Sequence, residues 1–176
     1  MTLRERYYFK FYKTTVFNKV TVYLLLCFLL LSCFSFCQET KDYKFNWYPT
    51  IEIKDDIIKL PDSSKYETYN TKGVWEDNLG DYGMMKCIVS QFTNNELKIT
   101  LDGYCEAIDH NKIKFWLYIN RKSYNLAGVG DAKYLFTDIK YKTLLNKTCL
   151  YAAQILEGGG VFKLVCKLSV EEYKIL

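Results

Sequence analysis

The sequence predicts an all-β protein: a single antiparallel β-sandwich or small β-barrel that follows an N-terminal signal or anchor segment. Short stretches in which apolar and polar residues alternate recur at intervals of about ten residues, and Gly, Asn and Asp separate them. No strand–helix–strand units occur in the pattern, which argues against a parallel sheet. Aromatic residues make up 17% of the chain, which indicates a packed core rather than a disordered chain.

The first 37 residues are predicted to be a signal peptide or membrane anchor. A basic leader precedes the only long apolar run, which extends from Val20 to Cys37. This order is typical of a segment that enters the membrane while its start stays on the cytoplasmic side. Three outcomes stay open: cleavage that leaves Gln38 first, lipidation of Cys33 in a stretch, LLSC, that resembles a bacterial lipobox, and an uncleaved anchor.

The rest of the chain is expected outside the cytoplasm, in the periplasm, in the cell envelope or secreted, with membrane contact only through the N-terminal segment. The leader holds five of the 24 basic residues and one of the 20 acidic residues. The body therefore has 19 basic and 19 acidic residues and carries no net charge. A nucleic-acid partner is not expected, since nucleic acid is bound by a clustered positive surface.

A flexible tether is predicted over 38–46, which is polar and charged, and the β-domain is predicted over 47–176. Two short strands or a hairpin are expected between residues 50 and 60, where Asp55-Asp56 interrupts the alternation. Pro61–Lys72 is polar and rich in turn residues, so it is predicted to be a loop.

The remainder of the β-domain is predicted to consist of strands joined by short turns. Asp102-Gly103 is predicted to form a two-residue type I′ turn. Tyr124–Asp131 contains two glycines and fits either a bulge or a loop. Thr148–Leu156 fits both a helix and a strand, and a strand is preferred. Further strands are expected at Gly83–Phe92, Leu97–Leu101, Tyr104–Ile108, Ile113–Ile119, Tyr134–Lys142 and Phe162–Val170.

Four cysteines follow the apolar run and are predicted to form two disulfides: Cys87, Cys105, Cys149 and Cys166. An even number of cysteines in an exported chain favours disulfides, and the spacings match no zinc motif. Three connectivities are possible. If the strands follow one another as a meander, the pairs Cys87–Cys105 and Cys149–Cys166 are the easiest to form.

Gly73-Val74-Trp75 is the most suggestive local feature of the β-domain. A G-x-W sequence that enters a small antiparallel β-domain resembles the opening motif of lipocalin-like barrels. The resemblance covers three residues, and the polar stretch before them leaves the first barrel strand unassigned. It implies that Trp75 closes the floor of the barrel and that the ligand is small and apolar. The alternative is that Trp75 anchors the core beside a flexible Gly.

Trp116 and Tyr118 are the other candidate ligand-binding residues. They alternate with Phe115 and Leu117 in the most regular predicted strand, so they are expected on its opposite face. Aromatic residues in a row on an outer sheet face can stack on a glycan or on a partner protein. The alternative is a strand buried on both faces, or rings that cover Lys side chains.

No cofactor, metal or catalytic site is predicted. His110, the only histidine, lies in a predicted turn, and no G-x-S-x-G motif accompanies it. The acidic run Glu76–Asp81 lacks the EF-hand pattern, so a solvated turn is expected there instead of a Ca²⁺ site. The two glycine-rich stretches do not lie between a strand and a helix, and they are interpreted as turns.

Three functional hypotheses follow. The first is a non-enzymatic exported β-domain of the cell envelope or periplasm that binds a partner protein, a glycan or a small ligand. The second is a lipocalin-like carrier of a small apolar ligand. The third is a small secreted hydrolase that uses carboxylates, although no pair of acids is nominated by the sequence. If Trp75, Trp116 and Tyr118 share an outward patch, partner binding is favoured, and if they line a cavity, the carrier is favoured. Convergent buried acids with raised pKa values would favour the hydrolase.

Overall fold

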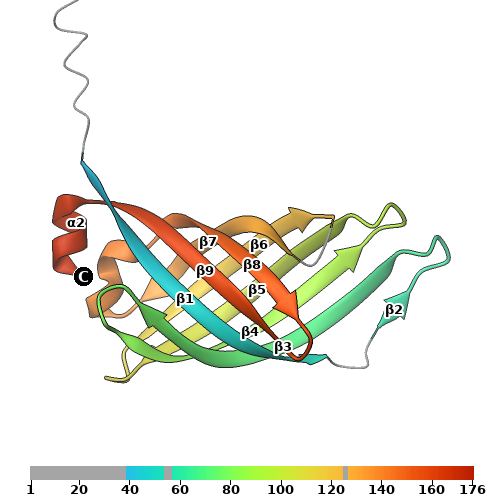
Figure 1. Cartoon of the computed structure of the whole chain (residues 1–176), viewed down its shortest axis with the longest axis horizontal. Helices are drawn as coiled ribbons and strands as arrows, with labels where there is room; N and C mark the ends of the chain where they lie inside the picture. The colour runs from blue at the N-terminus through green and yellow to red at the C-terminus, as the bar shows by residue number, and fades with distance from the viewer. Residues whose placement is uncertain (1–38, 54–56, 125–126) are drawn as a thin grey trace, which may run out of the picture. The chain divides into compact units, whose positions relative to one another are not determined.

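Figure 1 shows a closed antiparallel β-barrel of eight strands, with one extra short strand, in a computed structural model of the chain. The structure describes residues 39–53, 57–124 and 127–176. The chain divides into Met1–Gln38 and Glu39–Leu176, and the barrel is the second unit. The predicted signal or anchor segment, with Cys33, lies outside the described residues. The all-β prediction is confirmed, and the barrel is the form that the chain adopts.

The strands follow one another as a meander. In chain order the elements are β1 Thr40–Ile53, β2 Ile58–Lys59, β3 Lys65–Asp77, β4 Tyr82–Thr93, β5 Ile99–Asp109, β6 Lys114–Ser123, β7 Ala127–Thr137, η1 Ile139–Leu144, β8 Thr148–Leu156, β9 Gly159–Ser169 and α2 Val170–Ile175. Each strand from β3 to β9 pairs antiparallel with the next, and β1 pairs with both β9 and β3, which closes the barrel. The short β2 pairs with β3. None of the described helices has the length and apolar character needed to cross a membrane.

The inner face of the barrel is the core of the domain, which is why alternation predicted most strands. In β5 every second residue from Ile99 to Asp109 is buried, and the residues between them are at least partly exposed. A closed barrel requires this pattern, because its inner face is shielded and its outer face meets solvent. The predicted strand Thr148–Leu156 is confirmed as β8 on the same grounds.

Three hairpin turns share one design. The first residue of each turn is Asp77, Asn94 or Asp109, and its Oδ1 accepts hydrogen bonds of 2.8–3.1 Å from the backbone N–H groups two and four residues later. The residue three positions later has a positive φ of 94°, 63° or 69°, respectively. Asp and Asn favour such turns because their short side chains bond to nearby backbone groups. These side chains therefore fix where three pairs of strands begin.

The tether predicted over 38–46 is wrong from Thr40 onward, because β1 begins there. Tyr43 and Phe45 point into the barrel and are completely buried. The outward residues next to them, Asp42 and Lys44, are charged, and Lys41 at the start of the strand is exposed. Lysines are common on exposed strand faces, and here they make a half-buried strand look like a polar segment.

The loop predicted over Pro61–Lys72 is wrong from Lys65 onward, where β3 begins. The inward residues of this part of β3 include Glu67 and Thr71, which are polar although they are buried. The alternation of burial is therefore present without an alternation of hydrophobicity. The strands between residues 50 and 60 are present as parts of β1 and β2, but each pairs with β3 and they do not form a hairpin.

The turn predicted at Asp102-Gly103 is wrong, because β5 runs through both residues without interruption. Gly103 points into the barrel, where an added Cβ would lie 2.9 Å from Val89 Cγ2 and 3.2 Å from Ile119 Cγ1. The glycine therefore allows close packing between β4, β5 and β6, and its freedom to turn is not used.

The strand predicted over Tyr134–Lys142 is wrong after Thr137, where β7 ends and η1 follows. The C-terminal residues form α2, a helix that was not predicted. The Ser169 hydroxyl accepts from the Glu172 N–H, and the Glu172 carboxylate accepts from the Ser169 N–H. This capping box has the sequence S-x-x-E, which is a recognisable start signal for a helix.

The two predicted disulfides are present and link the pairs that a meander favours. Cys87–Cys105 joins β4 to β5 and Cys149–Cys166 joins β8 to β9, with Cα atoms 4.0 Å and 4.5 Å apart. All four cysteines are buried inside the barrel. Two disulfides are consistent with an extracellular or otherwise oxidising compartment.

Removal of either disulfide should destabilise the barrel. The bridged cysteines are 18 and 17 residues apart in sequence, and opening a loop of this size restores chain entropy to the unfolded state. We expect the double variants Cys87→Ala/Cys105→Ala and Cys149→Ala/Cys166→Ala each to lose about 3 kcal/mol of unfolding free energy in urea titrations. Reductant should lower the stability of the wild type further than that of either variant. Equal stability of variants and wild type would contradict the prediction.

Candidate functional site

The barrel interior is filled at the end that carries η1 and α2, called the helix end below (Figure 1). Phe45 stacks on Trp75 with ring centroids 5.1 Å apart, and Phe115 meets Trp75 edge-on at 5.5 Å. Tyr141 of η1 packs on Phe115 at 4.9 Å and is buried together with Leu144. η1 therefore covers this end, and aromatic rings occupy the space beneath it.

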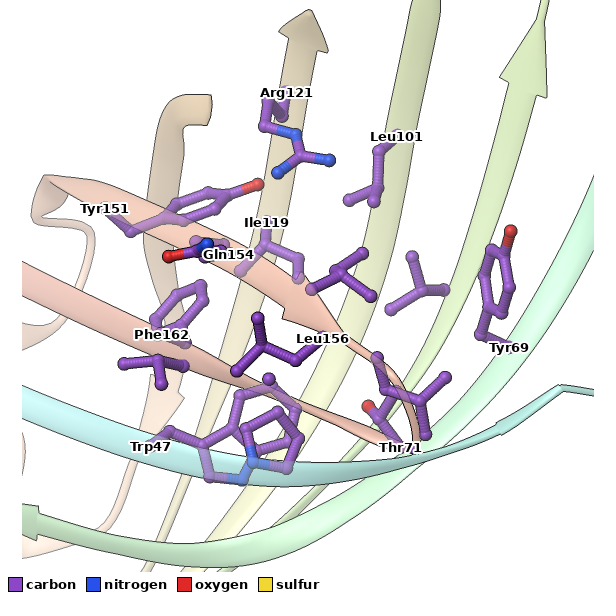
Figure 2. Close-up of a pocket in the computed structure, with 18 of the residues that line it drawn as sticks. Trp47, Tyr69, Thr71, Leu101, Ile119, Arg121, Tyr151, Gln154, Leu156 and Phe162 are labelled. Carbon is purple, nitrogen blue, oxygen red and sulfur yellow. The ribbon is translucent and has the colours of Figure 1, made fainter. Parts of the chain in front are cut away.

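The opposite end, called the turn end, contains a cavity of about 400 Å³ (Figure 2). The β4–β5 hairpin turn points toward this end, and the β8–β9 turn contributes to the cavity lining (Figure 1). Most of the lining side chains are apolar or aromatic, and they come from most of the barrel strands. They include Trp47, Val89, Leu101, Ile119, Tyr151 and Phe162. A cavity of this size and composition is typical of a site for a small molecule.

One wall of the cavity is aromatic. Phe162 stacks on Tyr151 with ring centroids 4.5 Å apart and meets Trp47 edge-on at 5.8 Å. The three residues belong to β9, β8 and β1, which are neighbours in the barrel. Their rings form a rigid apolar surface, because each is held by its neighbour.

Two polar side chains of the cavity wall are almost completely buried. Arg121 and Tyr151 are each 2% exposed, and Figure 2 shows the Tyr151 hydroxyl on the side of the ring that faces the Arg121 guanidinium. Burial lowers the pKa of Arg121, but a guanidinium keeps its proton in proteins. Burial also raises the pKa of Tyr151 to about 12, so its hydroxyl is a neutral donor at pH 7. Within the described part of the chain, the Tyr151 hydroxyl and Trp47 Nε1 have no hydrogen-bond partner.

The glycines of β7 leave room for these two polar side chains. A Cβ on Gly128 would lie 3.2 Å from Arg121 Cδ, and a Cβ on Gly130 would lie 2.8 Å from the Tyr151 ring. Gly130 would also place its Cβ 2.2 Å from the Asn120 carbonyl oxygen. From the sequence, Tyr124–Asp131 fits either a bulge or a loop. In the structure the glycines are strand residues, and at these two positions the inner face of β7 has no side chain.

A second buried polar group lies beside the cavity. Glu67 accepts hydrogen bonds from the Tyr69 hydroxyl at 2.8 Å and from Gln91 Nε2 at 3.2 Å, and it forms an ion pair with Lys65 at 2.9 Å. Across the strands, Glu67 is opposite Gln91, Gln91 opposite Leu101, and Leu101 opposite Arg121. The negative charge of Glu67 is therefore balanced by Lys65 and held by neutral donors.

The three predicted ligand-binding residues do not come together. Trp75 is 1% exposed and donates from Nε1 to the Met84 carbonyl at the filled helix end. Trp116 and Tyr118 point outward from β6, where they donate to Glu106 and Asp102, respectively. Trp116 also lines an outer depression of about 440 Å³. The residues that line the inner cavity were not predicted from the sequence. The signal that could have indicated them is Arg121, which ends a row of inward apolar residues in β6.

An acidic group at the helix end has the composition of a metal site but holds a lysine. Ligand atoms of Asp81, Asp109 and His110 lie within 4.8 Å of one another. Lys140 Nζ lies 2.6 Å from Asp81 Oδ1 and 3.3 Å from Asp109 Oδ2, where a bound cation would be expected. Burial alone would raise the pKa of Asp109, but hydrogen bonds from the Ile113 N–H and from Lys140 outweigh it and lower the pKa. We interpret this group as a structural ion pair.

Comparisons with known proteins support the fold alone. A crystal structure of a protein with unknown function from Clostridium acetobutylicum ATCC 824 is similar, with a TM-score of 0.63 and 14% sequence identity, over 74% of this chain and 98% of that chain. The chain matches no protein-family model and no curated protein. The resemblance of Gly73-Val74-Trp75 to lipocalin-like barrels therefore stays a prediction.

Substitution of Gly130 should destabilise the barrel. An alanine there must displace the backbone of β6 and the Tyr151 ring, so we expect Gly130→Ala to lower the free energy of unfolding by about 3 kcal/mol. Val129→Ala is the matched control, because Val129 is 62% exposed on the outer face and should change stability by about 0.5 kcal/mol or less. Urea titrations measure both. Equal values for the two variants would show that β7 tolerates a side chain at Gly130.

Asp109 should stabilise the barrel in a pH-dependent way. Its pKa is lower in the folded state than in the unfolded chain, so its stabilising effect is full above the ordinary pKa of Asp and disappears as the pH falls through the folded-state value. We expect Asp109→Asn to lower the free energy of unfolding by about 2 kcal/mol at pH 7. The difference from wild type should shrink in urea titrations below pH of about 4. A difference that stays constant with pH would contradict a role for the charge.

Proposed function

We propose that the barrel is a non-enzymatic binding domain that takes up a small, largely apolar molecule in the turn-end cavity. The observation that carries this proposal is the cavity itself, about 400 Å³ inside a closed barrel and lined mainly by apolar and aromatic side chains. Small-molecule sites in proteins have volumes of about 300–1,000 Å³ and a few polar groups in an apolar wall. Small eight-stranded barrels can hold one small ligand in their interior.

We place this function outside the cytoplasm. The two buried disulfides support that placement, because such bridges persist in oxidising compartments. The basic leader and apolar run of the first 37 residues support it independently. The domain would then act in the periplasm, in the cell envelope or as a secreted protein.

The outer aromatic residues are less suited to bind a ligand. Trp116 Nε1 is bonded to Glu106, which also lies 3.3 Å from Lys86 and 3.7 Å from Lys114. Tyr118 is bonded to Asp102 in the same way. The polar atoms of both side chains are therefore already bonded to acidic residues of the barrel wall.

An enzymatic use of the cavity would require two acids at its wall, as carboxylate-dependent hydrolysis does. Among the described lining residues Glu157 alone is acidic, and it is exposed at the β8–β9 turn. Burial raises the pKa of Asp77, but this residue belongs to the β3–β4 turn and does not line the cavity. These positions favour binding over hydrolysis as the proposed function.

Filling the cavity should abolish binding. Ala153 of β8 lines the cavity and Ala152 beside it is exposed, so Ala153→Phe and Ala152→Phe form a matched pair on opposite faces of one strand. The probe is N-phenylnaphthylamine, a neutral dye whose emission rises when it leaves water. We expect Ala153→Phe to weaken dye binding about tenfold or more and Ala152→Phe to leave it unchanged. Equal binding by both variants would place the dye site outside the cavity.

A further inference from the structure

We infer that the ligand of the turn-end cavity is an amphiphile with a carboxylate, whose charged group is bound by Arg121 and Tyr151 while its apolar body packs on the aromatic wall. This inference rests on the proposed function and adds the chemical class of the ligand. Four features of the described residues carry it: a buried positive charge, an unused hydroxyl donor, space kept for both side chains, and an apolar surface that extends away from them.

The buried positive charge comes first. The inward residues of β6 are Phe115, Leu117, Ile119 and Arg121, so the row changes from apolar to cationic at the cavity. Removal of a guanidinium from water is unfavourable, and burial lowers the pKa of Arg121. A planar guanidinium also matches a carboxylate in shape, because the two groups can share a pair of parallel hydrogen bonds. An anion in the cavity would therefore recover free energy that burial of Arg121 costs.

Tyr151 supplies the second donor. The residue is 2% exposed, and its hydroxyl makes no hydrogen bond within the described part of the chain. A buried hydroxyl without a partner is unfavourable, and it gains most from an acceptor that is charged. In Figure 2 the hydroxyl is on the side that faces the Arg121 guanidinium. A carboxylate has two oxygens, so one group can accept from both residues.

Space for this pair is provided by β7. Gly128 lies against the aliphatic part of Arg121, where a Cβ would be tight at 3.2 Å, and Gly130 lies against the Tyr151 ring, where a Cβ at 2.8 Å would displace it. The nearby acid Glu67 is held by Lys65 and by the Tyr69 hydroxyl. Glu67 is therefore already occupied, and a carboxylate in the cavity would meet Arg121 and Tyr151, whose side chains are packed against β7.

The apolar body of the ligand has a separate surface. Figure 2 shows Trp47 and Arg121 at opposite sides of the cavity, with Ile119 and Leu156 between them. A molecule with one charged end and a hydrocarbon chain can satisfy both sides at once. A fully neutral ligand would leave Arg121 buried without a new anionic partner, and a cationic ligand would be repelled.

The test compares three probes with the same hydrocarbon chain: decanoate, decanol and decyltrimethylammonium. Isothermal titration calorimetry should show that the wild type binds decanoate at least about tenfold more tightly than decanol. Hydrogen bonds to a charged group contribute enough binding free energy for a difference of this size. Decyltrimethylammonium should bind more weakly than decanol. The Arg121→Met variant should bind decanoate about 10- to 100-fold more weakly and leave the affinity for decanol within about threefold.

Two further variants make the result specific. Lys122→Met is the matched control, because Lys122 is the next residue of β6, carries the same charge and is exposed on the outer face. It should leave all three affinities unchanged. Tyr151→Phe should weaken decanoate about fivefold and leave decanol unchanged. If Arg121→Met fails to fold, the single variants Arg121→Lys and Tyr151→Phe test the same contacts. Lysine keeps the positive charge, so Arg121→Lys should still bind decanoate more tightly than decanol.

The failures of the two proposals are distinguishable. If the wild type binds neither decanoate nor decanol, the proposed binding function is overturned, and the inference with it. If it binds decanol as tightly as decanoate, or if Arg121→Met and Lys122→Met weaken decanoate equally, the cavity binds apolar molecules but does not select a carboxylate. That outcome overturns the inference alone.

Discussion

The double pairing of β1 is the constraint on which the rest of the structure depends. Trp47 is opposite Trp75 of β3 in one pairing and opposite Phe162 of β9 in the other, so a single strand joins the two ends of the meander. Closure removes the free edges that would otherwise expose unpaired backbone groups in these strands. It also fixes the diameter, because an eight-stranded barrel has room for side chains or for one small ligand. The inward residues then decide whether a given level is filled or hollow.

The inward residues divide the barrel into two levels with different properties. At the helix end Phe45, Trp75 and Phe115 fill the interior, and Tyr141 of η1 packs onto them. At the turn end the inward positions include small residues, so that a cavity of about 400 Å³ remains between the aromatic wall and Arg121. The filled helix end supplies buried apolar area that stabilises the domain. The residues of the turn end can therefore serve the binding of a ligand.

The sequence predicted those elements whose local pattern agrees with their environment. β4, β6 and β9 alternate clearly, and the two disulfides follow from the order of strands along the chain. It failed where an inward residue is polar, as Glu67 is, or where a glycine serves packing, as Gly103 does. The pattern left a sandwich and a small barrel open, because the register of β1 on β3 and β9 depends on contacts between distant parts of the chain. The residues that line the cavity depend on the same register, so the sequence did not identify them, although one hypothesis was a carrier of a small apolar ligand.

Some of the places where the pattern failed or was ambiguous lie at or beside the turn end, while the start of β1, η1 and α2 were misjudged at the helix end. The supposed loop contains Tyr69 and Thr71, which line the cavity, and Gly103 packs against Val89 and Ile119, which line it too. The ambiguous glycines of β7 adjoin Arg121 and Tyr151. A sequence that serves folding alone has little reason to place polar residues and bare glycines on the inner face of a barrel, since apolar side chains there would add stability. Departures from the folding pattern that gather around one cavity are expected where a site is maintained at the expense of stability.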